Sequence, residues 1–299
     1  MKLIVTGGNG FVAGSIIRQA PVEWELHALS RGEKPLGQVG LHSHRVDPGD
    51  TATLATLFAK TRPQALIHTA ALADIDYCEA HPTEAYAVNV ELTRTLAALC
   101  AEHRTRLILC STDTIFDGEH APYVEDAEPG PLNCYARTKV EAESIVRQLG
   151  PLGVIARLAL VVGLPVLGAG NSFLAKMLAT LGSGDQLGVP AHEVRTPVDV
   201  ITLGRALLEL ATNDYTGNIH LSGNDSLNRF EIAKRIAVHF GLPPELIVPT
   251  DTAKIAGRAP RPRDVSLNNS QARSTLHTPM LGFDAALTLI TQTGQIQTS

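Results

Sequence analysis

Short apolar runs alternate with amphipathic segments along the first half of the chain. The apolar runs predict buried strands at residues 2–6, 25–29, 43–46, 65–68, 106–110 and 154–157. Apolar residues at helical spacing predict helices at 11–20 and 135–148, one helix capped by Asp50 and one long helix capped by Thr83. This alternation predicts an α/β fold, in which helices cover both faces of a doubly wound parallel sheet of the Rossmann type.

The pattern becomes less regular after Arg157. Helices are predicted at about 172–181, 200–211, 229–240 and 283–291, and strands at 194–197 and 218–221. Because the segment from 200 to 221 resumes the earlier alternation of helix and strand, we expect residues 1–160 and about 194–222 to form the dinucleotide-binding domain. Residues from about 161–193 and 223–299 would then form a smaller, interleaved α/β domain that binds the substrate.

Composition and charge exclude several classes of protein. Of the 299 residues, 44% are hydrophobic and 18% are charged, which is enough apolar surface for a full core and excludes a largely disordered chain. The 25 basic and 30 acidic residues give a net charge of −5, so we expect no general attraction to nucleic acid or to an anionic membrane. The longest uncharged stretch, 158–175, is interrupted by glycine and proline and makes a poor membrane span.

The start of the chain and the cysteines indicate a compartment. The opening residues MKLIVTGG do not have the pattern of a signal peptide. The cysteines have neither CxxC spacing nor a metal-ligand pattern, so we expect free thiols in a reducing cytoplasm and no metal site. These cysteines are Cys78, Cys100, Cys110 and Cys134.

A glycine-rich loop follows the first predicted strand. Residues 6–14 have the sequence TGGNGFVAG and lead into the first predicted helix. Glycine permits a tight turn and lets a pyrophosphate approach the N–H groups at a helix N-terminus. The alternative is a tight turn without a ligand, but the strand–loop–helix context favours a dinucleotide site. Its predicted cofactor-binding residues are Gly7, Asn9, Gly10, Phe11 and Val12.

The end of the second predicted strand indicates which dinucleotide binds. Proteins that use NAD usually have an acidic residue here for the ribose 2′-hydroxyl, whereas the sequence HALSR at 27–31 has none. The guanidinium of Arg31 suits a 2′-phosphate instead. The sequence therefore favours NADP(H), with NAD(H) possible. The alternative is that Arg31 is a solvated loop residue.

Two further motifs suggest chemistry. Tyr135 and Lys139 form a YxxxK pair on one face of a predicted helix, where an ammonium can favour the phenolate and make tyrosine usable as a proton donor. Thr112 follows the fifth predicted strand, at the sheet edge where ligands bind. The alternatives are an exposed helical pair and a turn hydroxyl. The order of glycine loop, hydroxyl and YxxxK in one domain favours a functional interpretation.

These motifs together resemble the extended short-chain dehydrogenase/reductases, and within them the dTDP-4-dehydrorhamnose reductase family. The resemblance covers almost the whole chain. Its specific stretches are TAA at 69–71, STD at 111–113, FDG at 116–118, PY at 122–123, PLN at 131–133 and RP at 261–262. Asp76, Glu79 and Asn89 also follow in the family's order.

The chain departs from the family pattern at several positions. Ala13 replaces the third glycine of the loop, Thr114 replaces the tyrosine that follows STD, and Ala136 replaces the glycine after Tyr135. Residues 164–198 match poorly. The resemblance therefore transfers the reductase chemistry better than it transfers the identity of the substrate.

The resemblance implies the reduction of a nucleotide-linked 4-ketosugar by NAD(P)H. It assigns Tyr135 as the proton donor to the ketone, and Lys139 as the residue that lowers the tyrosine pKa and holds the nicotinamide ribose. Thr112 would bond the ketone oxygen, with Asp113 beside it. The resemblance places Asp47 near the adenine of the cofactor. It also places three residues after the fourth predicted strand in the cofactor cleft: Ala70, Ala71 and Leu72.

Other interpretations of the sequence stay open. Arg261 could pair with the nucleotide diphosphate, or it could be a structural arginine in a basic stretch. The chain could be a nucleotide-sugar epimerase or dehydratase of the same superfamily, or a non-catalytic subunit that binds a cofactor and regulates another enzyme. The expected partner is a nucleotide-sugar substrate, with neither nucleic acid nor membrane, and a homodimer is possible.

Overall fold

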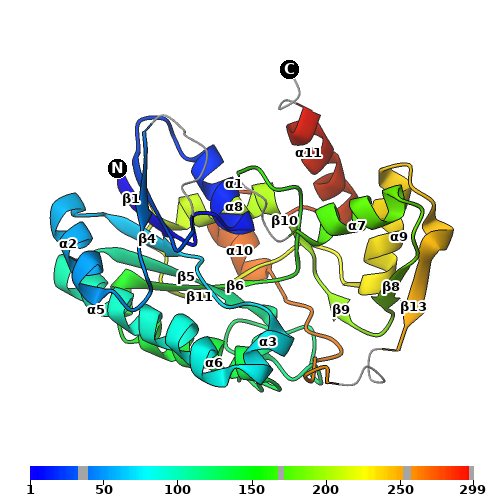
Figure 1. Ribbon diagram of the computed structural model, residues 1–299, viewed down its shortest axis with the longest axis horizontal. Helices are drawn as coiled ribbons and strands as arrows, with labels where there is room; N and C mark the ends of the chain where they lie inside the picture. Colours follow the sequence, from blue (N-terminus) through cyan, green and yellow to red (C-terminus); the bar gives the residue numbers. More distant parts are fainter. Residues whose placement is uncertain (33–39, 168–171, 252–256, 296–299) are drawn as a thin grey trace.

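A seven-stranded parallel sheet forms the centre of the molecule (Figure 1). The computed structural model describes residues 1–32, 40–167, 172–251 and 257–295. The order of the strands across the sheet is β11-β6-β5-β4-β1-β2-β3, and every neighbouring pair is parallel. The strands are β1 (Lys2–Thr6), β2 (Glu25–Ser30), β3 (Leu41–Arg45), β4 (Ala65–His68), β5 (Arg106–Thr112), β6 (Gly153–Leu158) and β11 (Gly217–Leu221).

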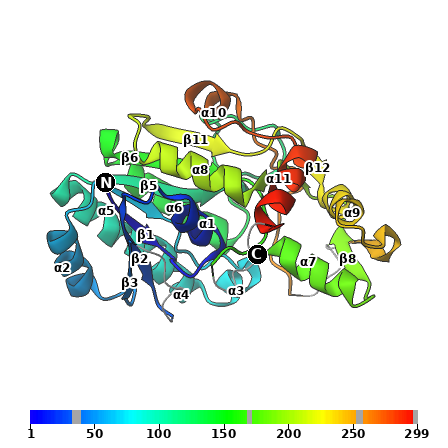
Figure 2. The ribbon, with the colours of Figure 1, turned by 90° about the horizontal axis from the view of Figure 1, so that it is seen from above.

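Helices cover both faces of this sheet (Figure 2), which confirms the predicted doubly wound α/β fold. Along β1, Leu3 and Val5 belong to one apolar cluster and Ile4 belongs to the other, as the alternation of side chains across a buried strand requires. The first face carries α1 (Phe11–Gln19), α8 (Val200–Leu210) and α10 (Ser270–Thr275). The second carries α2 (Thr51–Thr61), α5 (Leu92–His103) and α6 (Cys134–Arg147).

The prediction that Thr83 caps one long helix is wrong, because the helical region begins earlier and is divided. Asp74 caps α3 (Ile75–Ala80) by accepting a hydrogen bond from the Tyr77 N–H, and Pro82 then begins α4 (Pro82–Tyr86). Thr83 therefore lies inside α4. A π-helical segment, η1 (Ala87–Glu91), joins α4 to α5. The apolar spacing predicted the helical region, but Asp74 and Pro82 supply the stronger start signals.

A second lobe packs beside the carboxyl ends of the strands. Its helices are α7 (Phe173–Gly182), α9 (Arg229–His239) and α11 (Phe283–Gln295), which share one apolar cluster. Short strands complete it: β8 (Leu187–Pro190) with β13 (Ile247–Thr250), β9 (Val194–Arg195) with β12 (Leu227–Asn228), and β7 (Val161–Val162) with β10 (Val198–Asp199). The strand predicted at 194–197 is therefore only partly confirmed, because β9 covers Val194–Arg195 and the next strand, β10, begins at Val198. Short 3₁₀ turns occur at η2 (Asp113–Ile115), η3 (Gly150–Leu152) and η4 (Pro244–Leu246).

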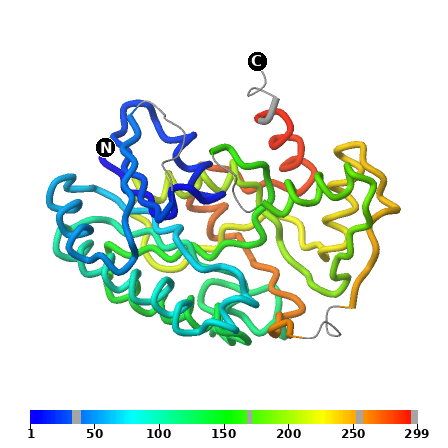
Figure 3. Tube along the Cα trace, in the orientation of Figure 1, coloured from blue at the N-terminus to red at the C-terminus, as the bar shows by residue number. Residues whose placement is uncertain are grey.

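The chain passes between the lobes more than once (Figure 3). After the second lobe, Ala272, Leu276 and Met280 pack into the cluster around α1 and α8 before the chain returns to α11. The division into residues 1–160 with about 194–222, and about 161–193 with 223–299, stays a prediction. The packing of α10 against β11 would add a short C-terminal piece to the sheet domain.

Candidate active site

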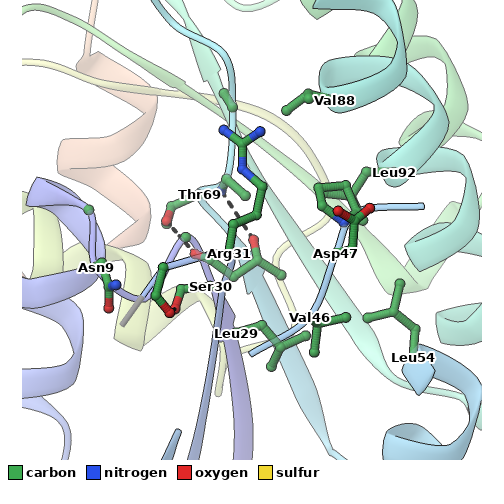
Figure 4. Close-up of a pocket in the computed structure, with 17 residues that line it drawn as sticks. Asn9, Leu29, Ser30, Arg31, Val46, Asp47, Leu54, Thr69, Val88 and Leu92 are labelled. Atoms are coloured by element: carbon green, nitrogen blue, oxygen red, sulfur yellow. Dashed lines mark hydrogen bonds between the residues drawn. The ribbon is translucent and has the colours of Figure 1, made fainter. Parts of the chain in front are cut away.

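A pocket opens at the carboxyl ends of β1, β2 and β4 and beside the loop after β3. Its volume is about 430 Å³. Figure 4 shows Asn9, Arg31 and Asp47 around it. Ligands of open parallel sheets bind at this edge. Of the predicted cofactor residues, those that line the pocket are Gly7, Asn9, Gly10, Arg31, Asp47, Ala70 and Ala71.

The glycine loop packs closely against the loop after β4 and leads into the N-terminus of α1. Gly7 has a φ of +69°, and a Cβ there would lie 2.9 Å from Thr69 Oγ1. Gly10 is the N-cap of α1 and supplies no side-chain cap. Phe11 and Val12 form the first turn of this helix, whose N–H groups favour an anion. These residues fit the pyrophosphate of a dinucleotide.

A buried hydrogen-bond chain fixes the floor of the pocket. The ring of His68 is bonded at Nδ1 to Thr6 Oγ1 (2.7 Å) and at Nε2 to Thr93 Oγ1 (3.0 Å). Thr6 Oγ1 also accepts a hydrogen bond from the Ala70 N–H (3.1 Å). Burial, aided by the charge of Lys139, lowers the His68 pKa to about 3, so this ring is neutral. Sequence reasoning missed His68, although its place at the end of β4 was a usable signal.

A second hydrogen-bond chain connects the loop after β4 with α6. Asn89, in the π-helical segment, accepts from the Leu72 N–H (2.8 Å) and donates to the Leu72 carbonyl (3.1 Å) and to Thr138 Oγ1 (3.0 Å). Thr138 in turn donates to the Tyr135 carbonyl (2.7 Å). Leu72 does not belong to the pocket lining and packs in the small cluster that contains Tyr135. It therefore sits between the pocket and the YxxxK helix.

Arg31 and Asp47 lie at the outer side of the pocket, after β2 and β3. Both are exposed. The Asp47 carboxylate accepts a hydrogen bond from the Gly49 N–H (2.9 Å), which orders the loop after β3. A cation after β2 and an anion after β3 thus face the same opening (Figure 4).

The YxxxK pair lies on α6, whose N-terminus is capped by Asn133. The Asn133 side chain accepts from the Ala136 N–H (2.9 Å). Lys139 is 2% exposed, its Nζ donates to the Cys110 carbonyl (2.8 Å), and burial lowers its pKa to about 8. Burial raises the pKa of Tyr135, and the neighbouring Thr112 hydroxyl opposes this shift only in part. Desolvation dominates the Tyr135 pKa and keeps the phenol protonated, and the predicted lowering of this pKa by Lys139 stays a prediction.

Thr112 ends β5 and belongs to a cluster of hydroxyl and carboxyl groups. Its Oγ1 lies 3.2 Å from Asp113 Oδ1 and 3.0 Å from Thr114 Oγ1. Burial raises the Asp113 pKa to about 6, while Arg195, 3.8 Å away, acts in the opposite direction. Arg195 comes from β9 in the second lobe, so the two lobes meet beside Thr112.

A buried ion pair supports α6 behind these groups. Glu143 and Arg157 are each 1% exposed and are joined through two guanidinium nitrogens, the shorter contact being 2.9 Å. Ser111 Oγ donates to Glu143 Oε1 (2.5 Å). Such a pair fixes geometry rather than adding much stability.

Arg261 contacts the other lobe through Asp76 of α3. Its two terminal nitrogens lie 2.5 and 2.8 Å from the two Asp76 oxygens, and this pairing lowers the Asp76 pKa. Arg261 also lines a second cavity, of about 440 Å³, together with Arg258 and Arg263. The guanidinium is thus engaged by a carboxylate at the margin of a basic cavity, and its predicted role toward a diphosphate stays a prediction.

The comparisons with known proteins identify the family. The family model described as RmlD substrate binding domain matches residues 1–296. The chain belongs to this family. The resemblance to dTDP-4-dehydrorhamnose reductases is thereby confirmed.

Individual relatives agree with this membership. A dTDP-4-dehydrorhamnose reductase of Sinorhizobium fredii is 31% identical over 244 residues, or 79% of this chain and 77% of that protein. The methionine adenosyltransferase 2 subunit beta of Bos taurus is 29% identical over 281 residues, or 90% of this chain and 81% of that protein. The crystal structure of the Bacillus anthracis dTDP-4-dehydrorhamnose reductase in complex with NADP has a TM-score of 0.86 at 22% identity, covering 98% of this chain and 99% of that one.

The helices and the cysteines bear on where the chain could reside. Across residues 1–32, 40–167, 172–251 and 257–295, no helix combines the length and the apolar character needed to cross a bilayer. All four cysteines are free and buried, and burial raises the pKa of the Cys100 and Cys110 thiols.

Proposed function

We propose that this chain is an NADPH-dependent reductase of a nucleotide-linked 4-ketosugar. The observation that carries the proposal is the grouping of Thr112, Tyr135 and Lys139 where β5 meets α6, at the same edge of the sheet as the pocket, although none of the three lines that pocket. The relative from Sinorhizobium fredii, a dTDP-4-dehydrorhamnose reductase, supports this class of reaction. The family membership supports it as well.

The pocket residues support NADP(H) as the cofactor. Gly7, Gly10 and the first turn of α1 would hold the pyrophosphate, and Arg31 would hold a 2′-phosphate at the outer side. The Bacillus anthracis relative is described in complex with NADP. NAD(H) stays possible because Asp47 lies at the same opening and a carboxylate can bond a ribose hydroxyl. The bound dinucleotide would supply the hydride.

The residues of this chain would supply the proton and the orientation. The protonated Tyr135 phenol is an acid that can donate to the oxygen of a ketone as that oxygen gains negative charge. Thr112 would bond the same oxygen and orient the carbonyl. The Lys139 ammonium, fixed by the Cys110 carbonyl, places a positive charge that stabilises the phenolate left after proton transfer.

The second lobe would bind the nucleotide part of the substrate. Arg258, Arg261 and Arg263 line its cavity of about 440 Å³, and arginine suits diphosphate oxygens. Arg258 already pairs with Glu193 (2.7 Å) and Arg261 with Asp76, so a diphosphate would share these guanidinium groups. Thr114, in place of the family tyrosine, is buried with its hydroxyl toward Thr112, so the sugar side of the site differs from the family pattern.

Turnover measurements test the proposal. The chain should oxidise NADPH in the presence of a dTDP- or UDP-linked 4-keto-6-deoxysugar, and the free ketosugar should react far more slowly because remote binding energy orients the reacting sugar. Boiled protein and the nucleotide diphosphate alone serve as controls. Equal kcat/KM for free and conjugated ketosugar would reject the substrate assignment. No NADPH oxidation with any nucleotide ketosugar would reject the reductase itself.

A regulatory role is the second candidate. It is favoured by one observation, the match over 90% of this chain to a subunit named as part of methionine adenosyltransferase 2. The presence of Thr112, Tyr135 and Lys139 favours chemistry instead. An epimerase or dehydratase would use the same residues but would show no net oxidation of NADPH, so the turnover assay also separates this class.

The assembly, compartment and domain limits are further proposals. The homodimer that the sequence leaves possible is tested by light scattering coupled to gel filtration, where a mass of one chain would refute it. Four free, buried thiols favour a cytoplasmic location. Separate apolar clusters for the sheet and for α7, α9 and α11 support the predicted domain limits, except that Ala272, Leu276 and Met280 pack in the cluster of the sheet.

A further inference from the structure

Three histidines and one glutamate lie together on β2 and β3, away from the catalytic residues. The pairing register sets His27 opposite His42 and Leu29 opposite His44. Because alternate residues of a strand share a face, Glu25 and His27 on β2 face the same side as His42 and His44 on β3. β3 is the edge strand of the sheet, so this group lies at its rim.

The side chains of this group are close enough to share an ion. One ligand atom each from Glu25, His27 and His42 lies within 4.8 Å of the other two. His27 Nε2 is 3.0 Å from Glu25 Oε1, and the His27 and His42 rings stack with centroids 4.9 Å apart.

We propose that Glu25, His27 and His42 bind a divalent transition-metal ion, with Zn²⁺ as the ion that fits best. Two imidazoles and one carboxylate are a common ligand set for zinc, and water would complete a tetrahedral site. Nitrogen ligands select against Mg²⁺ and Ca²⁺, which prefer oxygen. The metal would replace the proton between His27 Nε2 and Glu25 Oε1.

Two neighbours orient the proposed ligands. His44 Nε2 lies 2.9 Å from His27 Nδ1, so His44 can accept the N–H that His27 keeps at Nδ1 while Nε2 binds the metal. Metal-binding histidines usually donate their other N–H in this way. Lys2 contacts Glu25 through Oε2 at 3.5 Å, which leaves Oε1 on the side of His27.

The site would connect the edge strand to the sheet. β3 leads into Val46 and Asp47, which line the dinucleotide pocket, while β2 leads into Arg31. A metal between the two strands would therefore stabilise the outer side of that pocket without contacting the reacting atoms. This inference does not depend on the proposed reductase activity.

Metal titration of the full chain without an affinity tag tests the proposal. After dialysis against a chelator and then against metal-free buffer, Co²⁺ should produce the visible absorption of a tetrahedral site, saturate at one ion per chain, and be displaced by Zn²⁺. His42→Ala should abolish this binding, and His44→Ala should weaken it about 10–100-fold, as loss of an orienting partner does. His239→Ala, which removes an exposed histidine on α9, should leave it unchanged.

Thermal unfolding gives a readout that does not depend on absorption. Zn²⁺ should raise the Tm of the wild-type chain and of His239→Ala, but not that of His42→Ala, because a ligand stabilises only the state that binds it. If His42→Ala is poorly folded, His42→Gln serves instead. Binding that survives unchanged in both His42 variants, or a wild-type chain that binds no Co²⁺ and shows no Zn²⁺-dependent Tm, would overturn the proposal.

Discussion

Replacing Tyr135 by phenylalanine separates its proposed chemistry from its packing. The variant keeps the ring in its buried position on α6 and removes only the hydroxyl beside Thr112. Loss of a general acid slows turnover about 10²–10⁴-fold. At about 1.36 kcal/mol for each factor of ten, the activation barrier should therefore rise by about 2.7–5.4 kcal/mol.

The cost to folding should be much smaller. The hydroxyl has a neighbouring hydrogen-bond partner in Thr112, and an ordinary intramolecular hydrogen bond contributes about 1 kcal/mol to stability. Urea unfolding of Tyr135→Phe should thus show a change of at most about 1 kcal/mol. A loss of turnover that exceeds the loss of stability by several kilocalories per mole is the signature of a catalytic group.

Tyr123 provides a matched control with the opposite expectation. Its hydroxyl accepts from the N–H groups of Gly118 (2.9 Å), Glu119 (2.9 Å) and His120 (3.1 Å), and donates to the Asp117 carboxylate. Tyr123→Phe removes the acceptor of the Gly118 and His120 N–H groups, while the Glu119 N–H keeps Asp117 Oδ1 at 3.0 Å, and it should cost about 1–3 kcal/mol in unfolding free energy. Its kcat should fall less than that of Tyr135→Phe. A Tyr135→Phe enzyme with turnover within threefold of wild type would refute the assignment.

Three further predictions follow from the same site. Arg31→Ala should raise the Kd for NADPH about tenfold, or 1.4 kcal/mol, and leave that for NADH unchanged in matched titrations. Because the Lys139 pKa is about 8, kcat/KM for NADPH should fall as the pH rises above about 8 and the ammonium loses its proton; Lys139→Arg, which stays charged, should remove this decline. Asp76→Asn should destabilise the fold by only about 0.2–1 kcal/mol in urea, since the Asp76 side chain is 47% exposed.

The sequence predicted best those elements that have strong local signals. β1 and β4 have the predicted bounds, and α6 lies within one residue of its predicted start and end. Each consists of an apolar run or an amphipathic segment with clear turn or cap residues at its limits. The start of the helix after β4 was missed because Asp74 and Pro82 divide one amphipathic region into several short helices.

Contacts between distant parts of the chain could not be predicted from local patterns. The Asp76–Arg261 pair joins residues separated by 185 positions. The group on β2 and β3 was missed for a similar reason. Neither Glu25-x-His27 nor His42-x-His44 indicates a metal site by itself, and only the strand register brings the two pairs together. A rule based on ligand spacing within one segment therefore predicts no metal site here.

The geometry of the Tyr135–Lys139 pair follows from one strand and one helix packed together. Three successive residues of β5 contact three residues of α6 that are spaced by four: Thr112 is beside Tyr135, the Cys110 carbonyl accepts from Lys139, and Ser111 donates to Glu143. Side chains four residues apart lie on one face of a helix, so the YxxxK pattern of α6 extends to YxxxKxxxE on the face that packs against β5.

The third of these helix residues explains how Lys139 can stay buried beside the sheet. The Glu143 carboxylate favours the ammonium form of Lys139, whose pKa burial would otherwise lower further. Arg157 on β6 neutralises the same carboxylate and prevents it from being an isolated buried charge. The Tyr135 phenol, the Lys139 ammonium and the compensating ion pair are therefore all placed by regular secondary structure rather than by loops, and regular elements hold a site more rigidly. The parts of the site that are proposed to bind the substrate, Thr114 and the cavity lined by Arg258, Arg261 and Arg263, lie outside this strand–helix unit, and Thr114 is one of the positions that depart from the family pattern.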